Sequence, residues 1–257
     1  CRQVAPDLPL HASTQMTIHS LDGAKAAADL GMTRVVVSRE LSRDQIAYLC
    51  DRSPVEIECF VHGALCMCYS GQCFFSSVIG GRSGNRGMCA QPCRLNYGWG
   101  QTADKPLLSL KDMSLAKHLQ ELEEMGVACA KIEGRMKRPE YVAVVTKVYA
   151  TAIREHRDPT PGEQQALAHA FSRQGFTDGY FMDKTGRHMF GIREKTPVPT
   201  QLFAAAKGDY SKEHPTVPVK LYALVAAGEP VQVAAEDADG HIAKAEGPVP
   251  EAARKIS

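Results

Sequence analysis

Four cysteines in one stretch of the chain have the residue type and the spacing of a metal site. Cys66, Cys73, Cys89 and Cys93 follow the pattern C-x6-C-x15-C-x3-C. Thiolates are soft ligands, and four of them bind zinc or an iron–sulfur cluster. Structural zinc sites usually pair their cysteines as C-x2-4-C, which only the last two approach, so the spacing favours an iron–sulfur cluster. Zinc and a site without metal remain alternatives, and Cys68 competes for a place in the array.

The cysteine count and the composition argue against a disulfide framework. The chain has nine cysteines, and 44% of its 257 residues are hydrophobic. A chain of this size can bury a core without disulfides, and an odd count favours reduced thiols. The net charge of +1 gives no overall reason to bind nucleic acid, although a local basic patch stays open.

Targeting features are absent from the sequence. No apolar run approaches the roughly 20 residues of a membrane span, and no export signal opens the chain. We therefore expect a cytoplasmic protein without a membrane span. Because the chain opens with Cys1 rather than Met, we also expect it to be a piece of a longer protein.

A second group of charged residues occupies positions 131–138, with the sequence KIEGRMKR. Lys131, Glu133 and Arg135 alternate at the end of an expected strand, where side chains of a barrel strand point into the lumen. Charges in that position need partners or a ligand. The group forms either a salt-bridge network or a catalytic site for an anionic substrate, with Arg135 as a bidentate clamp.

Three further residues are candidates for the same site. Lys137 follows the charged group and could hold an anion, and Arg86 in the cysteine-rich stretch could contact phosphate or offset thiolate charge. His62 stands at the exit of an expected strand and could line a pocket as a catalytic residue. Each of them can equally be a structural polar group.

The surrounding elements alternate between strands and helices. We expect strands at 10–13, 33–38, 55–61, 106–110 and 127–133, and helices at 21–30, 42–50, 112–125, 139–155 and 161–173. This alternation is typical of parallel βα units in an α/β fold. No glycine-rich nucleotide loop follows a strand, so part of a (β/α) TIM-type barrel is favoured over a doubly wound sheet.

Three regions follow from this pattern. Residues 1–156 are expected to form the C-terminal part of the barrel, interrupted by a cysteine-rich loop at 62–100. That loop follows the carboxyl end of a strand, where barrel enzymes keep their active sites. Residues 157–216 form a helical or irregular extension, and 217–257 begin a small β-rich domain, with turns near 227–229 and 237–240.

Three stretches resemble the collagenase-like peptidases, the peptidase family of unassigned type numbered thirty-two. They are residues 58–76 (ECFVHGALCMCYSGQCFFS), 81–94 (GRSGNRGMCAQPCR) and 108–143 (LSLKDMSLAKHL to KIEGRMKRPEYVA). The resemblance implies a complete or incomplete (β/α) barrel. It also implies a [4Fe–4S] cluster on Cys66, Cys73, Cys89 and Cys93, in oxygen-independent hydroxylases of ribosomal RNA, transfer RNA or a quinone precursor.

The resemblance also implies partners. The RNA-modifying members depend on prephenate, so RNA and a small anionic co-substrate are the expected partners. The β-rich domain resembles that of the ribosomal-RNA type. One alternative is a peptidase with a polypeptide substrate, but no H-E-x-x-H or G-x-S-x-G motif occurs here. A second alternative is a non-catalytic metal-binding scaffold.

Overall fold

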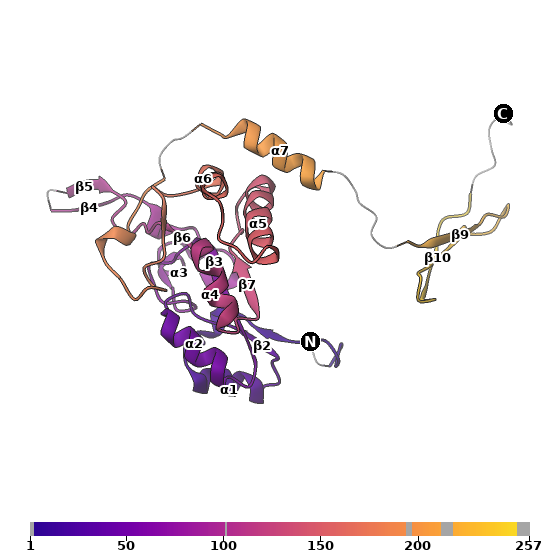
Figure 1. Ribbon diagram of the computed structural model, residues 1–257. Helices are drawn as coiled ribbons and strands as arrows, with labels where there is room; N and C mark the ends of the chain where they lie inside the picture. The colour runs from indigo at the N-terminus through magenta and orange to yellow at the C-terminus, as the bar shows by residue number, and fades with distance from the viewer. Residues whose placement is uncertain (1–2, 101, 194–196, 212–217, 251–257) are drawn as a thin grey trace. The chain divides into compact units, whose positions relative to one another are not determined.

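The computed structural model describes residues 3–100, 102–193, 197–211 and 218–250 (Figure 1). The chain divides into two compact units, residues 1–209 and residues 210–257. The first unit contains the cysteines of interest. Within the described residues, no helix combines the length and the apolar character that crossing a membrane requires.

The first unit is a mixed α/β structure built on one sheet, which confirms the expected fold class. Strands β1 (His11–Ala12), β2 (Arg34–Val36), β3 (Glu56–Ala64) and β7 (Cys129–Ile132) run parallel, with β3 between β2 and β7. The residues of β3 from 57 to 63 are all buried, as expected for a strand covered on both faces. The described strands form an open sheet, so the partial barrel remains a prediction.

The strand β6 (Asp112–Ser114) corrects the expectation of a strand at 106–110 and a helix led by Asp112. This strand runs antiparallel to β3, and β8 (Phe176–Thr177), which was not expected, pairs with β6. Asp112 is buried and binds Arg173 instead of capping a helix. The helical segment begins only with η4 (Ala116–His118) and continues as α4 (Leu119–Glu124).

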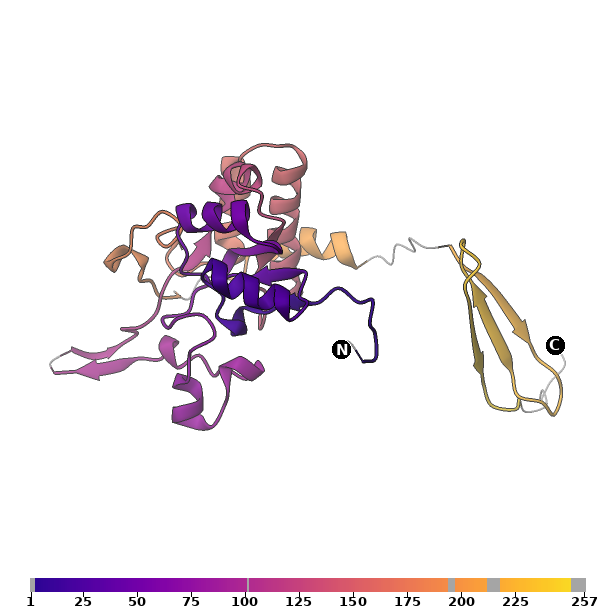
Figure 2. The same ribbon diagram turned by 90° about the horizontal axis from the view of Figure 1, so that it is seen from below.

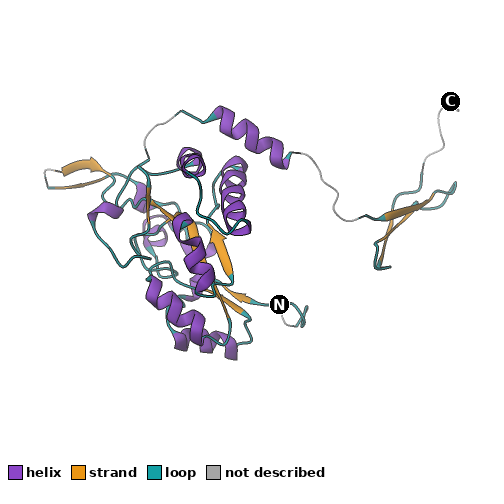
Figure 3. Ribbon diagram, viewed as in Figure 1, coloured by secondary structure: helices purple, strands orange, loops and turns teal. Residues whose placement is uncertain are grey.

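The helices α1 (Leu21–Asp29), α2 (Arg43–Arg52), α5 (Pro139–Arg154) and α6 (Pro161–Ala170) lie near their expected positions and flank the sheet (Figure 3). Local sequence sets their starts. Ser42 and Thr160 each form a capping box with the residue three positions later. The α6 helix ends at Ala170 rather than at 173.

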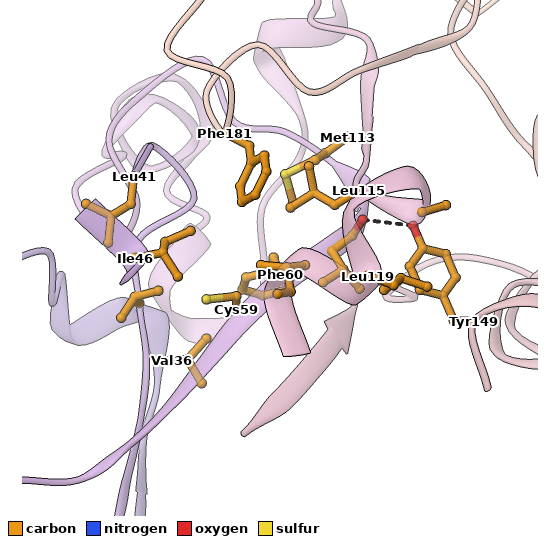
Figure 4. Close-up of a cluster of buried hydrophobic side chains, with 14 of the residues drawn as sticks. Val36, Leu41, Ile46, Cys59, Phe60, Met113, Leu115, Leu119, Tyr149 and Phe181 are labelled. Carbon is orange, nitrogen blue, oxygen red and sulfur yellow. Dashed lines mark hydrogen bonds between the residues drawn. The ribbon is translucent and has the colours of Figure 1, made fainter. Parts of the chain in front are cut away.

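Apolar side chains from distant segments make the core. Phe60 of β3, Met113 of β6 and Phe181 converge beside Leu41 and Ile46 (Figure 4). Helix α5 contributes Val145, Val148 and Tyr149, and the Tyr149 hydroxyl donates to the Val61 carbonyl at 3.0 Å. This packing fixes β3, the strand from which the cysteine-rich loop departs.

The cysteine-rich loop contains short helices instead of an extended βα connection. These are α3 (Phe75–Gly80), η2 (Gly84–Arg86) and η3 (Pro92–Arg94). A hairpin of β4 (Tyr97–Trp99) and β5 (Thr102–Lys105) follows, and the loop and hairpin project from the first unit (Figure 2). Two short 3-10 helices, η1 (Thr14–Met16) and η5 (Arg187–Met189), lie elsewhere in this unit.

Helix α7 (Thr200–Tyr210) ends at the boundary between the units. The second unit is an antiparallel sheet of β9 (Lys220–Leu224), β10 (Gln232–Glu236) and β11 (Ile242–Glu246). The expected β-rich segment is therefore present, with its turn at 237–240. The division at residues 156 and 216 remains a prediction.

Candidate functional site

The thiols of the four cysteines lie close enough together for charge on one to raise the pKa of another. All are free thiols, and charge on Cys73, Cys89 or Cys66 would act directly on Cys93. Burial raises the pKa of the Cys66 and Cys93 thiols, and their cysteine neighbours raise it further. Cys68 also acts on Cys73, and its Sγ donates to the Gln72 carbonyl at 3.5 Å, so it lies beside the array.

A glycine packs the cysteine-rich loop closely against η1. Gly71 has a φ of +78°, and a Cβ there would lie 2.5 Å from Thr17 Oγ1. The Asn85 side chain donates to the Gly71 carbonyl at 2.8 Å and so joins two segments within the loop.

Backbone amides are directed at two of the sulfurs. The Gln91 amide donates to Cys89 Sγ at 3.3 Å. The pKa of Cys73 is raised by burial, and an amide hydrogen bond from Phe75 opposes that shift. Such donors stabilise thiolates, whether free or bound to metal.

Two arginines bring positive charge to the same thiols. Arg39 lies with its guanidinium 3.7 Å from the centroid of Phe60, and Arg94 donates to the carbonyls of Leu65 and Leu110. Arg39 lowers the pKa of Cys66, against the effect of burial, and Arg94 does the same for Cys93. From sequence, Arg39 is one of several polar residues at strand ends that could line a pocket, and its effect on Cys66 could not be assigned. Its position directly after a buried strand was the available signal.

The structure separates the residues of the charged group at 131–138. Lys131 Nζ lies 2.6 Å from Glu58, which also lies 3.7 Å from Arg34. Lys131 is therefore part of a salt-bridge network with Glu58 and Arg34, one of the two alternatives for this charged group. Glu133 instead faces the cysteine side, where it binds Arg39 at 3.3 Å and accepts from the Arg135 amide at 2.9 Å.

Arg135 is exposed and reaches the cysteine-rich loop. Its Nη1 atom would lie 3.6 Å from a Cβ at Gly87. Arg86 is also exposed, at the end of η2. Both side chains can therefore meet a substrate that approaches the loop from solvent.

His62 lies in the interior, with 1% of its surface exposed. Its Nδ1 atom is 3.1 Å from the Tyr149 hydroxyl, and its ring packs on Tyr141 and Phe176. Burial lowers the pKa of His62 to about 3, with a further contribution from Lys137. At neutral pH this imidazole is uncharged, and Nε2 has no hydrogen-bond partner within the described chain.

A cavity of about 290 Å³ lies on another part of the sheet, near the end of β6. Lys117, His118 and Asp178 line it. His118 is held between two carboxylates, Asp178 at 3.1 Å and Glu121 at 3.4 Å. No spacing in the sequence indicated this site, because its residues come from distant segments.

Comparison with known proteins gives the family. Residues 1–190 match the family model described as peptidase family U32. The chain is 42% identical over 186 residues to the 23S rRNA 5-hydroxycytidine C2501 synthase of Escherichia coli, covering 70% of this chain and 28% of that protein. It is 39% identical over 165 residues to the tRNA hydroxylation protein P1 of Bacillus subtilis, covering 60% and 39%.

A collagenase of Porphyromonas gingivalis is also similar, at 34% identity over 201 residues, with 67% of this chain and 47% of that protein covered. The chain thus spans between about a quarter and half of the length of these relatives. No solved structure matches it significantly. The family match agrees with the three sequence stretches and with the cysteine array. The chain belongs to peptidase family U32.

Proposed function

We propose that this chain is the cluster-binding part of an oxygen-independent RNA hydroxylase. The observation that carries the proposal is the set of four free thiols, Cys66, Cys73, Cys89 and Cys93, gathered on the loop after β3. Two of the similar proteins are named for hydroxylation of ribosomal or transfer RNA. Such a role implies a protein that works in the cytoplasm with its RNA substrates.

We infer a [4Fe–4S] cluster on Cys66, Cys73, Cys89 and Cys93 rather than a single zinc ion, because only two of them approach the paired C-x2-4-C spacing of structural zinc sites. Zinc binds sulfur at about 2.3 Å in a tetrahedron, which holds the sulfurs within about 4 Å of one another. Within the part of the chain that the structure describes, no three of these sulfurs all lie within 4.8 Å of each other. When bound, a [4Fe–4S] cluster on these four thiols would supply electron transfer.

Other side chains of the loop and its surroundings would then compensate thiolate charge and contact the RNA. Arg39 and Arg94 offset thiolate charge from the protein side. Arg135 and Arg86 are free to meet RNA phosphates at the surface of the loop. Tyr69 and Phe74 are exposed on the same loop, at 71% and 65%, and each offers a ring on which a base can stack.

The peptidase alternative has less support from the site. A cysteine peptidase needs a histidine that activates the thiolate. His62 is buried and uncharged, and within the described residues no hydrogen bond joins a histidine to a cysteine. We infer that the resemblance to a collagenase reflects shared ancestry of the fold.

The test is hydroxylation of RNA by the anaerobically prepared chain, with prephenate as the co-substrate. We expect mass spectrometry of digested RNA to find a nucleoside that has gained one oxygen atom. A Cys73→Ala variant should lose this product, while a Cys50→Ala variant, altered in α2 away from the loop, should keep it. Unmodified RNA together with cleavage of a collagen-type peptide would overturn the proposal.

A further inference from the structure

Lys137 differs from other lysines of the first unit because it has no direct counter-ion. Lys131 and Lys147 each bind a carboxylate, at 2.6 and 2.9 Å. Within the described part of the chain, no carboxylate lies within salt-bridge distance of Lys137 Nζ. The side chain of Lys137 is half-buried, and its Nζ atom lies 2.8 Å from the centroid of the Phe171 ring. The fold thus holds an amine against an aromatic ring without pairing its charge.

A tight turn before α5 fixes the position of this lysine. The Lys137 amide donates to the Gly134 carbonyl at 3.0 Å, and Met136 between them has a φ of +61°. Residues other than glycine rarely adopt this left-handed conformation. A Cβ at Gly134 would lie 3.1 Å from Val142 Cγ2, so α5 packs closely against the turn. The turn therefore limits the positions that the lysine side chain can reach.

Two arginines and one aspartate complete the surroundings of the Phe171 ring. Arg193 lies 3.9 Å and Arg173 lies 5.0 Å from the ring centroid. Arg173 also binds the buried carboxylate of Asp112 at 2.6 Å. We call Lys137, Arg173, Arg193 and Asp112 the Phe171 cluster. When Lys137 is protonated, three positive charges and one negative charge give this cluster a net charge of +2.

The surroundings of Lys137 favour its neutral form. Burial lowers the pKa of Lys137 to about 7, Asp112 opposes this shift, and the guanidinium groups of the cluster and of Arg94 add to it. The other titratable groups near this amine are the uncharged His62 and the ring of Tyr141, whose centroid lies 5.4 Å from Nζ. Near pH 7 a large share of Lys137 is therefore a free amine, whereas a lysine with the ordinary pKa of about 10.4 is almost entirely ammonium.

We propose that Lys137 is a modification site at which carbon dioxide forms a carbamate. The neutral Nζ atom attacks the carbon of CO2, and one nitrogen–carbon bond forms. The electron pair of one carbon–oxygen π bond moves to oxygen, and Nζ releases one proton to solvent. No group is oxidised or reduced. The product is a lysine side chain that ends in a carboxylate.

The carbamate balances the charges of the Phe171 cluster. It replaces one positive charge by one negative charge, so the net charge of the cluster falls from +2 to zero. Guanidinium groups bind carboxylates through charge-assisted hydrogen bonds, and Arg173 and Arg193 lie around the same ring as the amine. Like charges gathered at a partly buried position are unfavourable, and the modification removes that repulsion. This inference goes beyond the proposed function and does not depend on it, because the modification needs neither iron nor RNA.

Chemical trapping under isotope-labelled carbon dioxide tests the proposal on the whole chain. The protein is equilibrated with ¹³CO2 at a fixed pressure, and a trialkyloxonium salt then converts carbamates into stable esters. Tandem mass spectrometry of the digested protein locates the label. We expect the label on Lys137, in a fraction that rises as the pH rises from about 6 to about 8, because only the neutral amine reacts.

Variants separate the cluster from the rest of the surface. In Arg193→Gln the affinity of Lys137 for CO2 should fall roughly tenfold, the effect of one charge-assisted hydrogen bond. In Lys147→Gln, altered at an exposed lysine of α5, the label on Lys137 should not change. Carbon dioxide should also raise the urea midpoint of the unmodified chain but not that of Lys137→Gln, because the carbamate forms in the folded state.

Three results would overturn the proposal. The first is an unlabelled Lys137 over the whole pH range. The second is equal labelling of Lys137 and Lys147, which would indicate unspecific reaction of surface amines. The third is unchanged affinity for CO2 in Arg193→Gln. The first two are measured on the unmodified chain, so a variant that fails to fold does not affect them.

Discussion

The buried imidazole of His62 makes the stability of the fold depend on pH. Its pKa is about 3 in the folded chain, because burial disfavours the charged form, and about 6.5 in an unfolded chain. Between these values the unfolded state binds one more proton than the folded state. The free energy of unfolding must therefore fall as the pH falls below about 6.5.

The size of this effect follows from the two pKa values. Each pH unit between them corresponds to about 1.4 kcal/mol, so moving from pH 7 to pH 5 removes about 2 kcal/mol through His62. A His62→Gln variant removes the titration and keeps a group that can hydrogen-bond the Tyr149 hydroxyl. Its free energy of unfolding should fall by about 2 kcal/mol less over the same interval.

Urea denaturation of both proteins at pH 7 and pH 5 measures the difference. The comparison uses the change with pH, so an overall loss of stability in the variant does not affect it. A His188→Gln variant, altered at an exposed histidine, is the control and should follow the unmodified chain. Identical pH dependence in the His62→Gln variant and the unmodified chain would refute the buried, uncharged imidazole.

Two further predictions concern the surroundings of the site. Asp112→Asn should lower the free energy of unfolding by roughly 3 to 5 kcal/mol in urea denaturation, because it leaves Arg173 buried without its counter-ion; an unchanged midpoint would contradict this. Gly71→Ala should lower the free energy of unfolding by roughly 1 to 3 kcal/mol, because the φ of residue 71 is +78° and the new Cβ would meet Thr17 Oγ1. In the control variant Gly80→Ala the new Cβ meets no atom within 4 Å, so the free energy of unfolding should not fall.

The sequence was sufficient for the parts of the fold that depend on local patterns. The three consecutive valines at 35–37 and the apolar run of β3 indicate buried strands without further information. Ser42 as a cap placed the start of α2 correctly, and Pro161 placed the start of α6. The type and the spacing of the cysteines predict a site on Cys66, Cys73, Cys89 and Cys93, all of which lie on the loop after β3.

Longer-range features could not be predicted in this way. Asp112 is a good helix-capping residue by type, but its partner Arg173 lies 61 positions later, and that buried pair places it in an antiparallel strand. The same holds for Arg39, whose contacts with Phe60 and Glu133 depend on the packing of three segments. Lys137, Arg173 and Arg193 likewise come from three segments without a shared sequence pattern, and the fold places all three around the Phe171 ring.

The central claim is that Cys66, Cys73, Cys89 and Cys93 bind one iron–sulfur cluster. Anaerobic purification followed by iron, sulfide and zinc analysis tests it most directly. We predict about four irons and four sulfides per chain, with the broad visible absorption of a thiolate-bound cluster. Cys73→Ala should lose them and Cys68→Ala should retain them. Stoichiometric zinc, or no metal under strict anaerobic conditions, would contradict the claim.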